Sequence, residues 1–430
     1  MDHFELFKNH LKQREQQAQD LLSVLKYDSI IFDSGVESYY AEDDQTYPYR
    51  PAPAFKSWCP EVSSGSAIHV KLNSSAHLLR VIPQDFWHAS PEDGEWVKAF
   101  EESKVFSDRK SLVDSLPKTG RHLWIGPGLE MKDVSQWTLN LEAAVAHLHW
   151  DRGCKTAYEI ECLRDANRIA ALGHVAAREK FLEGGSERQI HHAYLVATSG
   201  LESELPYNNI VCLDQHAATL HYQYKSSERV EAGVLLIDGG HSVQGYGSDI
   251  TRTWVHYRAP ETFQLIRNDL EVLQKKLANQ AVVGMNFADL HLMSIDGIGQ
   301  ILLDHNVLKN TAQGEQEFRS LVRSFYPHGL GHMLGVLVHD VAGRQKNRAG
   351  AACDPHPEDE KLRTNRELRN KEVITVEPGI YWIPMLWKNL DSRYLNLPLM
   401  EELTLWGGMR IEDNVVVGQK PENLTREFLA

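Results

Sequence analysis

Widely separated segments of this chain place acidic and imidazole side chains among apolar residues and glycines. Asp238 is the last residue of the apolar run 234–238, and Asp249 is the first residue of a second run. Glu377 and Glu412 lie in comparable surroundings, and residues 328–332 contain two histidines and two glycines. Ionised side chains are costly in apolar surroundings unless something pairs with them. The fold must therefore bring these segments, far apart in sequence, to one place.

A metal site explains this pattern best. The candidate ligands are four carboxylates and one imidazole, from Asp238, Asp249, His332, Glu377 and Glu412. Such an oxygen-rich set suits Mn²⁺, with Co²⁺ or Zn²⁺ as alternatives. Thiolates are absent from it, which disfavours a structural zinc site. We predict a site for two divalent ions, which would make hydroxide available near neutral pH.

The two aspartates fit a β-hairpin over residues 234–254. Asp238 ends one strand, glycines at 245 and 247 support a turn, and Asp249 begins the return strand. If the aspartates face each other, their Cβ atoms lie about 5 Å apart. Carboxylates that close repel unless a cation lies between them. A hairpin with two aspartates beside its turn is the structural alternative.

The histidines at 328 and 332 have helical spacing, but Gly329 and Gly331 favour a tight loop. Glu377 precedes Pro378 and ends a strand at a turn, where site residues concentrate. Arg410 and Glu412 share a face of a predicted strand, so an ordinary ion pair between them is the structural alternative.

The 430 residues fit two or three domains. Helical periodicity in residues 1–27 and strand patterns at 29–33, 67–72, 77–82 and 122–126 predict a smaller α/β domain over residues 1–153. Residues 154–430 predict an α+β domain with helices on an antiparallel sheet. Its expected helices are 156–182, one starting at 186, 261–279 and 287–305, and its later strands are near 373–377, 379–383, 402–406 and 409–417. Residues 345–371 read as an exposed excursion.

Composition limits the binding partners and cellular locations that we expect for this chain. A formal net charge of -14 disfavours nucleic acid. No apolar run is long enough for a membrane helix, and the first residues do not resemble a signal peptide. The five cysteines are scattered and odd in number, which favours reduced thiols and a cytoplasmic protein.

These residues, in this order, resemble the pita-bread metallopeptidases, above all bacterial Xaa-Pro dipeptidases (prolidases) and organophosphorus acid anhydrolases. The segments that carry the resemblance are 206–211, 220–222, 249–253, 327–332, 338–341, 377–381 and 410–414, with 55–58 and 85–88 in the N-terminal half. The resemblance implies a C-terminal pita-bread (creatinase/aminopeptidase-like) catalytic domain after a smaller α/β domain that serves dimerisation and covers the substrate site.

The resemblance also implies ligand roles. Asp238 would chelate one metal ion, Asp249 and Glu412 would bridge both, and His332 and Glu377 would complete the second. The histidines that match the family's substrate-binding and intermediate-stabilising groups are His221, His328 and His339.

Further residues match the family's substrate contacts. Arg363 would hold the C-terminal carboxylate of a dipeptide, which would select substrates by length. Arg410 would support the metal ligands, and Tyr207 would form a pocket wall. The family is usually a homodimer, in which Asp44 or Trp87 would approach the partner's site.

The implied activity is hydrolysis of Xaa-Pro dipeptides through a metal-bridging hydroxide, with Glu377 delivering the proton to the prolyl nitrogen. Alternatives are an Xaa-Pro aminopeptidase that accepts longer peptides, an organophosphorus triester hydrolase, which could be a side activity, and a catalytically silent binding module. The last is disfavoured because all five ligands are present. Asn208, Gly239, Ala342 and Thr364 depart from the family's usual residues, and none of them removes a ligand.

Overall fold

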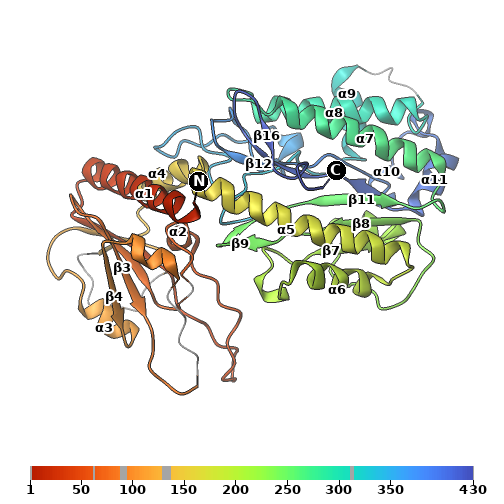
Figure 1. Cartoon of the computed structure of the whole chain (residues 1–430). Coiled ribbons are helices and arrows are strands. Elements are labelled where there is room, and N and C mark those ends of the chain that lie inside the picture. Colours follow the sequence, from red (N-terminus) through yellow and green to blue (C-terminus); the bar gives the residue numbers. More distant parts are fainter. Residues whose placement is uncertain (1, 62, 88–93, 128–136, 310–313, 430) are drawn as a thin grey trace. The chain divides into compact units, whose positions relative to one another are not determined.

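Figure 1 shows the computed structural model, which describes residues 2–61, 63–87, 94–127, 137–309 and 314–429. The chain divides into two compact units, Met1–Glu159 with Asn347–Ala351, and Ile160–Lys346 with Ala352–Ala430. The division falls inside helix α5 (Ala157–Leu182), and the boundary expected after residue 153 stays a prediction. His88, which belongs to one motif of the resemblance, lies outside the described residues.

The first unit is built on a six-stranded mixed sheet of order β4-β3-β2-β1-β5-β6. Its strands are β1 (Ser29–Asp33), β2 (Ala67–Lys71), β3 (Ala76–Val81), β4 (Glu102–Phe106), β5 (His122–Ile125) and β6 (Trp137–Leu139). Its helices are α1 (His3–Leu25), α2 (Pro53–Lys56), α3 (Arg109–Asp114) and α4 (Glu142–Gly153), with a 3₁₀ turn at Glu95–Ala99. All five residues of β1 are buried, because the strand lies between β2 and β5. The expected strands match β1, β2, β3 and β5; β4 and β6 were not foreseen.

Protonation of His10 in acid should lower the free energy of unfolding of the first unit. Its Nδ1 lies 2.9 Å from Thr156 Oγ1 and its Nε2 2.9 Å from the Ser57 carbonyl. Burial lowers the pKa of His10 to about 4. Because the unfolded pKa is near 6.5, the contribution of neutral His10 is complete above that pH and is lost as pH falls towards 4. The loss amounts to about 3 kcal/mol.

The measurement is the free energy of unfolding in urea between pH 7 and pH 4. His10→Gln should give a shallower fall with acid than the parent chain. Gln13→Ala, at an exposed position of the same helix, is the control and should keep the parent slope. An unchanged slope in His10→Gln would refute the assignment.

The strands of the second unit form two three-stranded and two two-stranded sheets. The strands are β7 (Ile210–Leu213), β8 (Val234–Asp238), β9 (Ser242–Val243), β10 (Tyr246–Gly247), β11 (Thr251–Val255), β12 (Val373–Val376), β13 (Gly379–Tyr381), β14 (Gly408–Arg410), β15 (Asp413–Val416) and β16 (Glu422–Asn423). The helices are α5, α6 (Glu187–Thr198), α7 (Glu261–Gln280), α8 (Phe287–Asp304), α9 (Glu315–Arg323), α10 (Pro384–Trp387) and α11 (Leu397–Thr404). Every strand pair described in this unit is antiparallel, as predicted.

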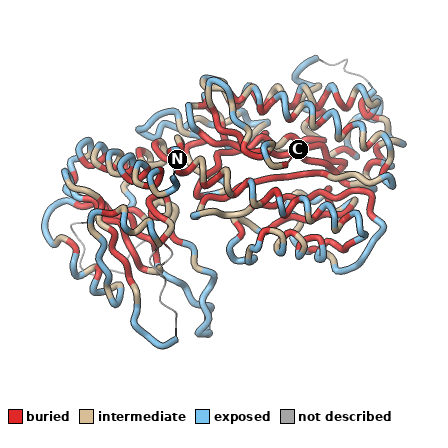
Figure 2. Tube along the Cα trace, viewed as in Figure 1, coloured by how far each residue is buried: buried red, intermediate tan, exposed pale blue. Residues whose placement is uncertain are grey.

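Helices α5 and α6 pack on the sheet β11-β8-β7 through an apolar cluster that includes Phe181, Ile190 and Val211. Helices α7 and α8 cover β12 and β15 through a second cluster that includes Leu277 and Val415. Figure 1 shows strands of this unit between the α7–α8 pair and the α5–α6 pair, and Figure 2 shows burial concentrated along those strands. The strands that carry candidate ligands therefore lie between two layers of helices.

Three expectations about this unit need correction. Residues 402–406 do not form a strand, because helix α11 extends to Thr404. Pro398 in its first turn and the good helix formers that follow favour a helix here. The expected strand 409–417 is two strands, β14 and β15, which pair with different partners. The end of the excursion 345–371 is not exposed, since Leu362 and Arg366 are buried.

Two further expectations concern the chain as a whole. All five cysteines are free thiols. Among the described residues, no helix is both long enough and apolar enough to cross a membrane.

Candidate metal centre and active site

One pocket of about 590 Å³ in the second unit gathers most of the candidate residues. Its lining includes all five candidate ligands, the three histidines and both arginines: Asp238, Asp249, His332, Glu377, Glu412, His221, His328, His339, Arg363 and Arg410. Tyr207 joins this set through a hydrogen bond to Asp238. Asp44 and Trp87 belong to the first unit and are exposed, and their approach to a partner's site stays a prediction.

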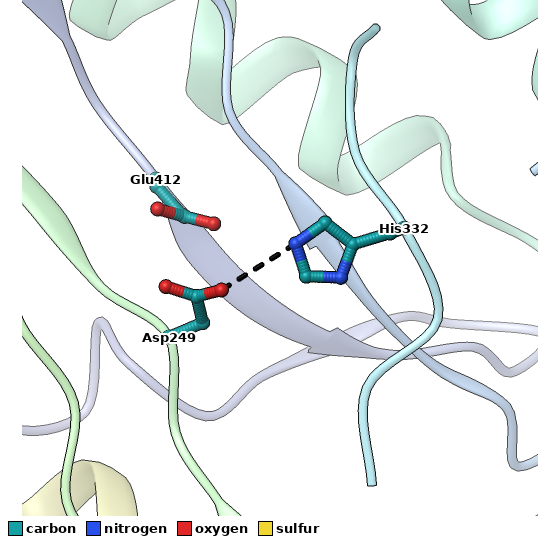
Figure 3. Close-up of side chains that lie close together, drawn as sticks. All are labelled: Asp249, His332 and Glu412. Atoms are coloured by element: carbon teal, nitrogen blue, oxygen red, sulfur yellow. Dashed lines mark ion pairs between the residues drawn. The ribbon is translucent and has the colours of Figure 1, made fainter. Parts of the chain in front are cut away.

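Three buried candidate ligands point toward one another (Figure 3). One ligand atom each of Asp249, His332 and Glu412 lies within 4.8 Å of the other two. His332 Nε2 is 3.4 Å from Asp249 Oδ2 and 3.5 Å from Glu377 Oε1. His332 Nδ1 lies 3.1 Å from the Met333 carbonyl, which fixes the ring and leaves Nε2 facing the carboxylates.

Asp238 is held from two sides. Its Oδ1 accepts a hydrogen bond from the Tyr207 hydroxyl, and its Oδ2 pairs with Arg410 Nη2, each at 2.7 Å. The ion pair considered between Arg410 and Glu412 is therefore wrong: the partner of Arg410 is Asp238. Strand β14 ends at Arg410, and the chain then turns so that Glu412 accepts a hydrogen bond from the Thr251 hydroxyl at 2.7 Å.

The hairpin register also differs from the expected one. Asp238 pairs with Thr251, and Asp249 lies before strand β11 begins. The Gly239 amide donates to the Ile250 carbonyl at 2.9 Å, so the ladder continues past Asp238. The intervening residues form their own small ladder, β9–β10, which lengthens the turn. Asp238 and Asp249 are consequently diagonal neighbours on one face rather than direct opposites.

The electrostatics of the pocket favour cations. Burial raises the pKa of Asp238 to about 6 and that of Glu377 to about 7, and the neighbouring carboxylate of Asp249 adds to both. Burial also raises the pKa of Glu412 well above its usual value. Burial opposes ionisation of Asp249 too, but the His332 hydrogen bond holds its pKa below the usual value. Buried carboxylates in this number fit divalent ions, which relieve both the desolvation and the mutual repulsion.

Two histidines of the pocket outside the candidate ligands, His328 and His339, are held in the neutral form by burial. Burial lowers the pKa of His328 to about 3 and that of His339 to about 4. His328 Nε2 lies 3.1 Å from the Tyr381 hydroxyl, which accepts from Arg410 Nη1 at 2.8 Å. Tyr381 was not predicted as a site residue, although it stands in the motif 377–381. The sequence signal that could have found it is its place in that motif, because a tyrosine hydroxyl that becomes buried needs a hydrogen-bond partner.

Comparisons with known proteins identify the family of this chain. Residues 161–419 match the model of metallopeptidase family M24, and residues 5–150 match the model described as the Xaa-Pro dipeptidase N-terminal domain. The chain belongs to metallopeptidase family M24. Among curated relatives, the Xaa-Pro dipeptidase of Shewanella amazonensis is 36% identical, with 98% of each chain covered. That of Marinobacter nauticus is 38% identical, with 99% of each chain covered.

Two solved aminopeptidase structures share the fold. Aminopeptidase P from E. coli aligns with a TM-score of 0.75 at 20% identity, covering 98% of this chain and 96% of that one. Proline aminopeptidase P II from Yersinia pestis gives a TM-score of 0.72 at 22% identity, covering 96% and 97%. The predicted pita-bread architecture is confirmed. Divalent metal ions are expected of this family, and the ligand set described above fits them.

One departure from the family pattern has a structural consequence. Ala342, where the resemblance leads us to expect glycine, has a φ of 71°. An L-residue in this left-handed region costs about 1–2 kcal/mol. The Ala342 carbonyl accepts a hydrogen bond from Arg366 Nε at 2.8 Å, and Arg366 is in turn paired with buried Glu372. These contacts hold the strained residue between His339 and the loop that carries Arg363.

Proposed function

We propose that this chain is an Xaa-Pro dipeptidase that hydrolyses Xaa-Pro dipeptides and releases proline, using two divalent metal ions. The observation that carries the proposal is the pocket itself: five side chains that could ligate metal ions and the cation of Arg363 line one cavity of about 590 Å³. A cavity of that size is in the range of small-molecule sites. The full-length similarity to curated Xaa-Pro dipeptidases supports it.

The ligand roles are part of the proposal. Asp238 would bind one ion, Asp249 and Glu412 would lie between the two, and His332 and Glu377 would complete the second. When bound, such a pair lowers the pKa of water and polarises a carbonyl, which supplies the nucleophile near neutral pH. Mn²⁺ is the proposed ion, with Co²⁺ or Zn²⁺ as alternatives.

The remaining residues would act on the substrate. Neutral His339 would donate a hydrogen bond to the oxygen that gains charge when the Xaa-Pro carbonyl is attacked. His328, whose Nδ1 proton goes to the Gly329 carbonyl at 2.9 Å, would line the substrate pocket beside it. His221 would hydrogen-bond the substrate, and Glu377 would carry the proton to the departing prolyl nitrogen. The Arg363 guanidinium would bind the C-terminal carboxylate of the dipeptide.

Supporting groups fix this arrangement. Arg410 and Tyr207 would orient Asp238, and Tyr207 would also form a wall of the substrate pocket. A homodimer in which Asp44 or Trp87 approaches the partner's site and organophosphorus hydrolysis as a side activity belong to the same proposal and rest on the resemblance. A cytoplasmic location is proposed from the five free cysteines.

An Xaa-Pro aminopeptidase is the second candidate, because the structural neighbours named above are aminopeptidases P. The two activities differ in whether the substrate may continue beyond proline. A cation that binds a terminal carboxylate favours the dipeptidase.

The test is proline release from Leu-Pro by metal-stripped protein with and without added Mn²⁺, beside a Leu-Pro-Xaa tripeptide. We expect metal-dependent cleavage of the dipeptide alone. Arg363→Met should then raise KM for Leu-Pro by about 10- to 100-fold, the cost of losing a hydrogen bond to a charged group. Lys361→Met, which removes a neighbouring cation of the same pocket, is the matched control and should have a smaller effect.

Cleavage of both peptides would establish the aminopeptidase instead. Cleavage of neither by metal-loaded protein would refute both activities.

A further inference from the structure

Glu187 is a buried carboxylate outside the metal pocket that collects four hydrogen-bond donors. Its side chain is 1% exposed and lies in the first turn of α6, after a Ser186 capping box. Oε1 accepts from the Leu213 amide at 3.0 Å and lies 2.7 Å from His216 Nδ1. Oε2 accepts from the Tyr222 hydroxyl at 2.9 Å and the Ser226 amide at 2.7 Å. A carboxylate near a helix N-terminus is also stabilised by the helix dipole.

All four donors belong to one stretch of chain, residues 213–226, which we name the His221 segment. It leaves β7 at Leu213, passes through a 3₁₀ turn at Asp214–Ala218 and presents Leu220 and His221 to the pocket. Glu187 therefore binds both ends of the segment as well as Tyr222, the residue next to His221. The rings of His216 and Tyr222 stack at 4.6 Å, so the two side-chain donors also support each other.

The His221 ring itself is not held. Within the described part of the chain, no hydrogen bond or ion pair is formed by its nitrogens, and the residue is exposed towards the pocket. Its position must come from the backbone on either side. A loop backbone keeps one conformation only if its polar groups find fixed partners.

We propose that Glu187 is a positioning residue that sets the place of His221 in the substrate pocket. The inference rests on the proposed function, in which His221 contacts the substrate. Glu187→Gln replaces one carboxylate oxygen by an amide nitrogen, which faces donors instead of accepting from them. The segment must then shift, and a shift of about 1 Å in a substrate-positioning group can cost about 100-fold in rate.

The experiment is a double-mutant cycle on Leu-Pro hydrolysis with Glu187→Gln, His221→Ala and the double variant, all metal-loaded. We expect Glu187→Gln to lower kcat/KM by about 10- to 100-fold and to change the same parameter, KM or kcat, as His221→Ala. In the His221→Ala background, Glu187→Gln should lower kcat/KM by less than about twofold further, because the imidazole that Glu187 positions is already absent. An equal fall in both backgrounds would overturn the proposal.

Two further variants separate positioning from damage to the fold. Glu271→Gln alters another carboxylate of the second unit that binds arginine and lysine side chains, and it should leave kcat/KM unchanged. Tyr222→Phe removes a single hydrogen bond to Glu187 and should reproduce the effect of Glu187→Gln in weaker form. If Glu187→Gln does not fold, Tyr222→Phe decides: normal kcat/KM in this variant would overturn the proposal.

A readout without turnover keeps the inference distinct from the proposed function. The ¹³Cε1 signal of His221 can be identified because it is missing in His221→Ala. It should move in Glu187→Gln and stay in place in Glu271→Gln. An unmoved signal overturns the positioning role even if wild-type protein releases no proline, whereas inactive wild-type protein with a moved signal refutes only the proposed function.

Discussion

Asp249→Asn is expected to lower kcat/KM for Leu-Pro by about a thousandfold. The substitution keeps the shape of the side chain and removes the charge that faces His332 and Glu412. A bound ion contributes several kcal/mol of transition-state stabilisation, and each 1.4 kcal/mol is worth about tenfold in rate. Because Asp249 is proposed to contact both ions, the variant should also bind less metal.

The measurements are steady-state kinetics and metal content per chain. Asp304→Asn, at the exposed end of α8, is the control and should match the parent chain in both. Equal unfolding temperatures of the metal-free proteins would show that folding is intact. Full metal content together with full activity in Asp249→Asn would refute the proposed ligand set.

Arg252→Leu is expected to cost about 3–5 kcal/mol of unfolding free energy, because it breaks a fully buried ion pair from one side. Arg252 and Asp413 are both 0% exposed, with Nη2 2.8 Å from Oδ1. Arg252 also donates to the carbonyls of Glu412 at 2.8 Å and Leu429 at 3.0 Å. The variant would leave these acceptors buried without their donor.

Urea unfolding of the whole chain measures this effect. Arg393→Leu removes an arginine from an exposed pair with Asp391 and should not differ detectably from the parent chain. Replacing both partners, as Arg252→Leu with Asp413→Leu, should cost less than the sum of the two single changes, since neither Arg252 nor Asp413 is then left buried without the other. Arg426, which also pairs with Asp413, keeps Glu271 as a partner. A loss below about 1 kcal/mol in Arg252→Leu would mean that water reaches the site and compensates for the missing guanidinium.

Much of the fold was readable from local pattern. The spacing of apolar residues predicted α5, α7 and α8 closely, because a helix buries one side at a fixed period. Ser186 and Gln189 marked the start of α6 through a capping box that the structure contains. The buried run 29–33 predicted β1 because a central strand is covered on both faces. Residues 402–406 were misread as a strand, since a short apolar run fits either state and the proline before it decides for the helix.

The sequence by itself determined which side chains could form the site. Carboxylates and imidazoles in apolar, glycine-rich segments indicated a metal pocket, because buried carboxylates need a cation beside them and imidazole can serve as a further ligand. The pocket lined by Asp238, Asp249 and Glu412 is where the structure brings them together.

Only the tertiary structure decided which of these groups meet. Because β9–β10 lengthens the turn, Asp249 lies diagonally across from Asp238. Because the chain turns after β14, Arg410 forms its ion pair with Asp238 and not with Glu412. Glu187 carried no sequence signal beyond a place in a capping box, yet it binds both ends of the His221 segment. The physical reason is the same for Asp249, Arg410 and Glu187. Composition and hydrophobic periodicity indicate whether a single residue is buried, whereas its hydrogen-bond partners depend on strand register and on turns that bring distant residues together.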